Sequence, residues 1–131
     1  MREDGWAQQL LLLQLADDDA VVRILEATRP GVTGRELFET ATRAYDRAGF
    51  AGEEVRHHQG GATGYRSREW LAHPASEERV DTVQAFAWNP SVTGTKVEDT
   101  ALLTADGIEP ITHSPGWPLL EGRGSGLLRL D

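Results

Sequence analysis

The stretch that organises this chain reads His57-His58-Gln59-Gly60-Gly61-Ala62-Thr63-Gly64-Tyr65 and closes at Arg68-Glu69. Two adjacent histidines, which donate or accept protons near neutral pH, run directly into closely spaced glycines. Glycine permits sharp turns and a close approach of other atoms to the backbone. We interpret the stretch as a functional loop, with a surface loop carrying two solvated histidines as the alternative.

The residues upstream of this loop predict a first helix from Asp17 to Thr28. Three consecutive aspartates suit the first turn of a helix, because they meet the positive end of the helix dipole. Pro30-Gly31 ends the element. We interpret the aspartates as a solvated helix start rather than a metal site.

A second helix is predicted from Thr33 to Gly49. Thr33 and Glu36 have the spacing of a capping box, in which each side chain satisfies a free backbone N–H group. One apolar stripe runs along the helix. Tyr45 belongs to that stripe, and we expect it to be a core residue rather than a catalytic one.

The residues after the loop predict strands, at 80–88, 95–104 and 108–112. They are rich in Val, Thr, Leu and aromatic residues, and turn-forming residues separate them. If the first two strands form a hairpin, Asn89 and Glu98 lie nearly opposite each other, within side-chain contact. Lys96 shares a face with Glu98. Helices followed by an antiparallel meander indicate an α+β fold.

The composition excludes several classes of function. The chain has 131 residues, a formal net charge of −8 and no cysteine. An acidic protein lacks the basic face that nucleic acid or an anionic membrane needs, and disulfides and thiolate metal sites are excluded. The apolar run at 10–13 is too short to span a bilayer. We therefore expect a soluble, cytoplasmic protein that binds neither nucleic acid nor membrane.

We divide residues 1–131, a single domain, into an apolar lead-in segment (1–16), a main region (17–120) and a Gly-rich tail (121–131). An uncovered apolar strip is typical of a partner surface. We expect residues 6–15 to form a homodimer contact or to bind another partner. The alternative is that the chain is a fragment whose missing part packs there.

The order of these segments resembles the pita-bread hydrolases, the family of creatinase, prolidase, aminopeptidase P and methionine aminopeptidase. The resemblance covers residues 17–120. It rests on the capped helix, on the histidine–glycine loop, on Trp88-Asn89-Pro90 and on Gly94-Thr95-Lys96-Val97-Glu98-Asp99-Thr100. It implies a partial pita-bread domain, in which two N-terminal helices pack on a curved antiparallel sheet.

The peptidases of that family hold two metal ions with two Asp, one His and two Glu. By position, His57 corresponds to an accessory histidine that contacts substrate, and Gly61 stands where a metal-binding histidine belongs. Arg68 replaces a second, substrate-side histidine, and Asn89 replaces one glutamate. Glu98 is kept. With one ligand of five remaining, the resemblance implies no dinuclear metal site and no cofactor.

We consider three functions. The first is a degenerate, non-peptidase domain that binds a small molecule, a peptide or a protein partner. The second is a metal-free, creatinase-like hydrolase of a small amide or amidine, in which His57 or His58 transfers protons and Glu98 orients the histidine or binds a cationic substrate. The third is a metal-dependent Xaa-Pro aminopeptidase. The expected substrate-binding residues are Gln59, Tyr65, Arg68, Glu69, Asn89 and Lys96.

Overall fold

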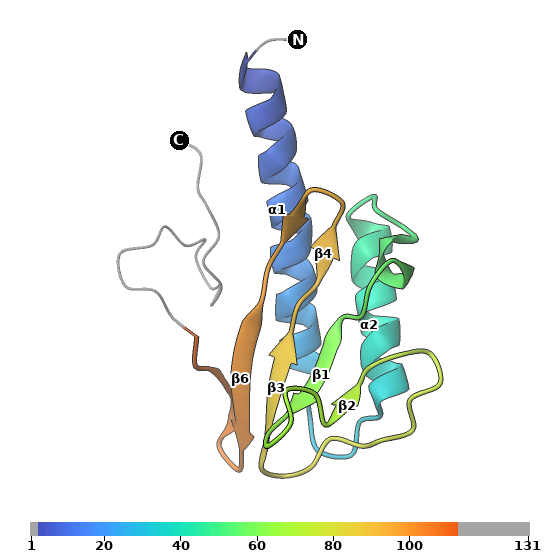
Figure 1. The fold of residues 1–131 in the computed structure, drawn as a ribbon, viewed down its shortest axis with the longest axis vertical. Coiled ribbons are helices and arrows are strands. Elements are labelled where there is room, and N and C mark those ends of the chain that lie inside the picture. Colours follow the sequence, from blue (N-terminus) through green and yellow to red (C-terminus); the bar gives the residue numbers. More distant parts are fainter. Residues whose placement is uncertain (1–2, 113–131) are drawn as a thin grey trace.

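Residues 3–112 are described by the structure, a computed structural model in which two helices cover one face of a sheet (Figure 1). The helices are α1 (Glu3–Ala27) and α2 (Gly34–Arg47), and a short 3-10 turn, η1 (Glu53–Val55), follows them. The expected α+β class is therefore confirmed. Within the described residues no helix is long and apolar enough to cross a membrane.

The five-stranded sheet has the order β2-β1-β3-β6-β7, and its strands are antiparallel. Its strands are β1 (Gly60–Thr63), β2 (Trp70–Leu71), β3 (Gln84–Trp88), β6 (Asp99–Thr104) and β7 (Gly107–Pro110). A separate small hairpin pairs β4 (Ser91–Val92) with β5 (Thr95–Lys96).

The predicted strands are shorter in the structure. The one expected at 80–88 is regular only in β3, and the one expected at 108–112 corresponds to β7. The one expected at 95–104 divides into β5 and β6. The Val97 N–H still donates to the Pro90 carbonyl (3.1 Å), in the same register as both flanking pairs of strands. Glu98 lies between β5 and β6.

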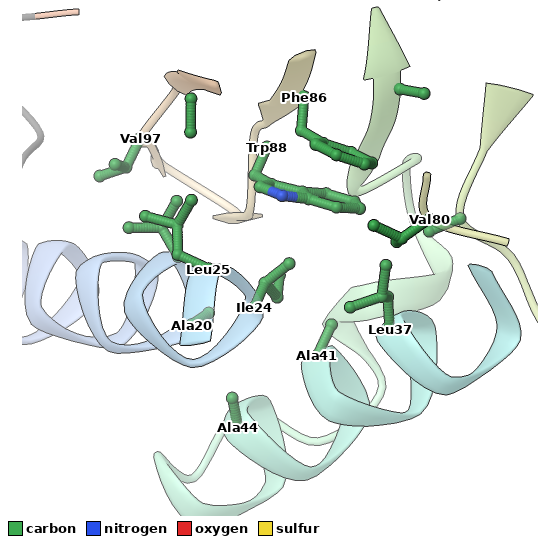
Figure 2. Packing of buried hydrophobic residues seen from close by; sticks show 14 of the residues in the cluster. Ala20, Ile24, Leu25, Leu37, Ala41, Ala44, Val80, Phe86, Trp88 and Val97 are labelled. Carbon is green, nitrogen blue, oxygen red and sulfur yellow. The ribbon is translucent and has the colours of Figure 1, made fainter. Parts of the chain in front are cut away.

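The core lies between the helices and the sheet. Ile24 of α1 and Leu37 of α2 point toward the ring of Trp88 (Figure 2). That ring stacks on Phe86 of the same strand, with centroids 5.7 Å apart. All four side chains are buried, so both helices are held to one sheet face by apolar contact.

The capping box of α2 is confirmed. The Glu36 N–H donates to the Thr33 hydroxyl (3.2 Å), and the Thr33 N–H donates to the Glu36 carboxylate (2.9 Å). These backbone bonds hold the pKa of Glu36 below its usual range. Tyr45 is fully buried, as expected of a core residue.

The end predicted for α1 is confirmed to within one residue, but its predicted start at Asp17 was wrong. The helix begins at Glu3, so most of the expected lead-in segment is helical. Leu, Gln and Ala, which are strong helix formers, fill that segment and carry the helix past the aspartates. Asp17 and Asp18 are fully buried rather than solvated. The expected Gly-rich tail at 121–131 lies outside the described residues.

Candidate functional site

The register of the sheet brings three separate segments to one end of it. Gly60 at the start of β1 pairs with Trp88 at the end of β3, and Trp88 pairs with Asp99 at the start of β6. The N–H of Asn89 donates to the carbonyl of Gln59 (2.9 Å), which extends the pairing by one step. The residues that flank these strand ends, namely the histidines, Asn89 and Glu98, therefore lie at the same end of the sheet.

His57 is fixed by contacts with both of its ring nitrogens. Nδ1 lies 2.8 Å from the His58 carbonyl oxygen. Nε2 lies 2.6 Å from the Ser91 hydroxyl and 2.8 Å from the Ser91 carbonyl oxygen. The ring is partly buried. The residue that orients His57 across the fold is therefore Ser91, which the sequence did not indicate, rather than the expected Glu98.

Glu98 pairs with two cations instead. Its carboxylate lies 3.8 Å from Nη2 of Arg68 and 3.6 Å from Nζ of Lys96. The carboxylate is half exposed, so each ion pair is screened and contributes little to stability. Its effect is local: the carboxylate compensates one of the two positive charges.

The exposed side chain of His58 is close enough to Arg68 and Lys96 for their charges to act on it. Desolvation lowers the pKa of His58, and the positive charges of Arg68, His57 and Lys96 lower it further. An interaction with the Asn89 side chain acts in the opposite direction. These effects favour the neutral imidazole of His58, the form that accepts a proton or a hydrogen bond from a polar ligand.

A cavity of about 310 Å³ lies between α2, η1 and β2, and both histidines line it. Its remaining lining is mostly apolar: Phe38, Glu54, Val55, Leu71, Ala72, His73 and Pro74. A mostly apolar wall with a few polar groups is typical of a small-molecule site. The expected site residues thus fall into a cavity-lining pair, His57 and His58, and a charged group formed by Arg68, Lys96 and Glu98.

Gln59 belongs to a buried network rather than to the cavity wall. Its side-chain oxygen accepts a hydrogen bond from the Tyr45 hydroxyl (2.8 Å), and its amide donates to the Glu54 carbonyl (3.1 Å). The Tyr45 hydroxyl in turn accepts the N–H of Ser91 (2.8 Å). This network joins α2, η1 and β4 beneath the histidines.

Two other expected substrate-binding residues lie in the loop between β1 and β2. Tyr65 is fully exposed and lies outside the cavity that it was expected to line. Glu69 accepts the N–H of Arg66 (2.9 Å), so its carboxylate closes the loop. None of the contacts recorded for Tyr65 or Glu69 joins either side chain to His57 or His58.

The residues present do not fit a dinuclear metal centre. A Cβ atom on Gly61 would lie 2.1 Å from the Trp70 carbonyl oxygen, so the backbone of β2 occupies the space where a ligand side chain would begin. Arg68 brings a permanent positive charge to the only expected ligand that is kept, Glu98. Among the side chains that the structure describes, no three His, Asp or Glu residues are grouped so that they could hold a metal ion.

The sequence analysis missed two buried carboxyl groups whose pKa is raised, those of Asp17 and Asp99. Burial raises the pKa of Asp17 to about 7, against the hydrogen bond from the Thr95 hydroxyl (2.6 Å). Burial raises the pKa of Asp99 to about 6. The signal was present for Asp17, because it precedes Val21 and Ile24 by four and seven residues and so lies on the apolar stripe of α1.

No protein-family model matches the chain. Over 102 residues it is 28% identical to a Xaa-Pro dipeptidase of Pyrococcus horikoshii and 29% identical to one of Pyrococcus furiosus, and both alignments cover 73% of this chain. The chain spans only 29% of the length of these curated relatives.

Two solved structures have the same fold over most of this chain. A dipeptidase from Mycobacterium ulcerans superposes with a TM-score of 0.70 at 24% identity, covering 82% of this chain and 30% of that one. A dipeptidase from Pyrococcus horikoshii gives a TM-score of 0.71 at 19% identity, covering 82% and 32%.

Proposed function

Because this chain is homologous to a part of the Xaa-Pro dipeptidases of the pita-bread family, we propose that it is a non-peptidase domain that binds a small molecule without a dinuclear metal centre. The observation that carries the proposal is the closed space at Gly61. A ligand side chain there requires the backbone of β2 to move, which a change of rotamer does not achieve.

Charge supports the same proposal. Two metal ions need several anionic or imidazole donors, whereas the expected position of the centre holds two cations and one carboxylate, those of Arg68, Lys96 and Glu98. This group carries one excess positive charge, although the formal net charge of the chain is −8. The local positive charge favours an anionic ligand. A small carboxylated amide or amidine fits, with Arg68 as the anchor of its carboxylate.

A metal-free hydrolase is the second candidate. Its support is His57, whose ring is oriented from both sides at the mouth of an apolar cavity. A well-placed general base contributes about 10²–10⁴ in rate, so the loss of metal ligands does not remove every route to catalysis. In this candidate His57 or His58 transfers the proton, and Glu98 contributes through the ion pairs that place Arg68.

The first experiment tests the metal. The protein is dialysed against MnCl₂, its metal content is measured by elemental analysis, and hydrolysis of a Xaa-Pro dipeptide is assayed on the same sample. We expect well under one Mn per chain and no hydrolysis, because Gly61 and Asn89 replace two of the metal-binding residues. Two Mn per chain together with dipeptide cleavage would overturn the proposal.

The second experiment tests the ligand. A panel of small carboxylated amides and amidines is compared with the matching uncharged methyl esters by thermal shift. A ligand at 100 times its Kd stabilises the folded state by about 2.7 kcal/mol. We expect a shift with the acids that disappears in Arg68→Gln and persists in Arg66→Gln, the exposed neighbour. Equal shifts with acids and esters would reject the anion anchor.

A further inference from the structure

We propose that Ser91 is a nucleophile activated by His57 and that the pair accepts acyl groups from small esters. This inference goes beyond the proposed ligand-binding function, because it concerns a covalent step at a residue outside the Arg68 group. Among the described residues, Ser91 is the only serine whose hydroxyl lies within hydrogen-bond distance of a histidine ring nitrogen, and the inference rests on this contact.

We assign the proton of the neutral His57 ring to Nδ1, which faces the His58 carbonyl oxygen at 2.8 Å. In this tautomer Nε2 accepts a hydrogen bond from the Ser91 hydroxyl at 2.6 Å. Nε2 also lies 2.8 Å from the Ser91 carbonyl oxygen, and Nδ1 lies 3.4 Å from the Gln59 amide nitrogen; these contacts suit the opposite tautomer, so the labelling experiment below tests this assignment too. A nucleophile bonded to a base that a third group orients is the arrangement that activates serine.

The position of Ser91 is fixed by the fold rather than by a free loop. Its N–H donates to the Tyr45 hydroxyl, which is held by Gln59, and both of these residues are buried. Ser91 itself pairs with Lys96 in the small hairpin and stays partly exposed. Because several elements hold it, the pair keeps its geometry without a ligand, as preorganised catalysis requires.

The acyl transfer balances within this pair. The Ser91 Oγ attacks the ester carbonyl carbon while its proton passes to His57 Nε2. The C–O bond to the leaving alcohol then breaks, and Nε2–H returns the proton to the departing oxygen. The products are an acyl ester on Ser91, a free alcohol and a neutral His57. Water activated by the same nitrogen hydrolyses the acyl ester.

Two features limit the rate and the substrate. The Ser91 N–H is already donated to Tyr45, so it does not stabilise an oxyanion, and the loss of one such donor costs about 10²–10³ in rate. We therefore expect slow acylation by activated esters rather than fast turnover. The cavity beside His57 is walled by Phe38, Val55 and Leu71, which favours a small apolar acyl group.

The test uses p-nitrophenyl acetate and a fluorophosphonate probe on the whole chain, without added metal. We expect one adduct per chain by intact mass, located on Ser91 by peptide mapping, with matching release of p-nitrophenol. His57→Gln should slow labelling by about 100-fold, and Ser91→Ala should abolish it. Ser67→Ala, which removes an exposed loop serine, should label as the parent does.

Mapping of the unmodified chain locates the adduct directly, so the result does not depend on whether a variant folds. No adduct, an adduct on another residue, or equal labelling of a folded His57→Gln variant would overturn the proposal. None of these outcomes affects the metal-binding and carboxylate-binding experiments above, so the two proposals are tested independently.

Discussion

In the metal-free site that we propose, Gly61 and Arg68 oppose a dinuclear metal centre by different physical means. At Gly61 the obstacle is steric, because the backbone of β2 fills the place of a side chain. At Arg68 it is electrostatic, because the guanidinium neutralises the kept carboxylate of Glu98 and repels a divalent cation. Restoring one donor therefore does not restore a site, since the other obstacle remains.

The steric argument predicts the cost of adding a single methyl group. Gly61→Ala places a Cβ atom 2.1 Å from a backbone oxygen, and we expect a loss of about 1–3 kcal/mol in the free energy of unfolding, the usual range for overpacking. The measurement is urea denaturation. Gly64→Ala is the control, because its Cβ meets only the Glu69 side chain at 3.3 Å. Equal stability of the two variants would show that β2 moves freely.

A second prediction at this scale concerns Asp17 and pH. Its pKa is raised from 3.8 to about 7 by burial, so the folded state keeps a proton that the unfolded state releases. This stabilisation is complete below about pH 4 and is lost as pH rises through 7. Asp99, whose pKa is raised to about 6, acts in the same direction. We expect stability to fall by a few kcal/mol between pH 4 and 7.

Asp17→Asn tests the origin of that slope. The amide oxygen still accepts the Thr95 hydroxyl but cannot ionise, so the variant should lose less stability over the same pH range. Asp18 and Glu53 face the same carboxyl and remain. The control is Asp19→Asn, on the same helix but partly exposed and paired with Arg23 at 3.3 Å. If Asp17→Asn keeps the full slope in denaturation measured at each pH, the assignment is wrong.

At the scale of elements, local signals predicted α2 but not the start of α1 or the burial of its aspartates. The capping box of α2 is a contact between residues three apart, so the sequence contains all that it needs. The burial of the aspartates in α1 depends on distant partners, because Asp17 accepts a hydrogen bond from Thr95 of β5. The aspartates were interpreted from charge alone, and their place on the apolar stripe was overlooked.

For the strands and the site, too, features set by neighbouring residues could be predicted, whereas contacts between distant segments could not. The position of Asn89 and Glu98 at one sheet end follows from alternation and hairpin pairing, which the sequence carries. The contact of His57 with Ser91 joins residues 34 apart, which lie in the loop before β1 and in β4. No local pattern couples these two segments, so Ser91 could not be selected from the sequence.

At the scale of the whole molecule, α1 carries apolar surface that the rest of the described chain leaves uncovered. The first turns of α1 extend past the end of the sheet (Figure 1). Leu12 has an exposed fraction of 61%, and Leu15 of 38%. Both line a cavity of about 390 Å³ whose other walls include Ala16 and Phe50. We propose that a second copy of the chain packs here, and that this part of residues 6–15 forms the contact.

Leu15→Glu tests this homodimer by sedimentation equilibrium. Residues 6–15 make up about 15 Å of α1, so the proposed contact is a short helical one. A carboxylate placed in an apolar contact loses its hydration, so we expect the dimer to weaken by at least about 10-fold. Leu102→Glu is the matched control, because Leu102 has the same exposed fraction, 38%, on strand β6. If the parent chain is a monomer, there is no such dimer. If both variants weaken the dimer equally, the contact lies elsewhere, because only a dimer formed through α1 distinguishes Leu15 from Leu102.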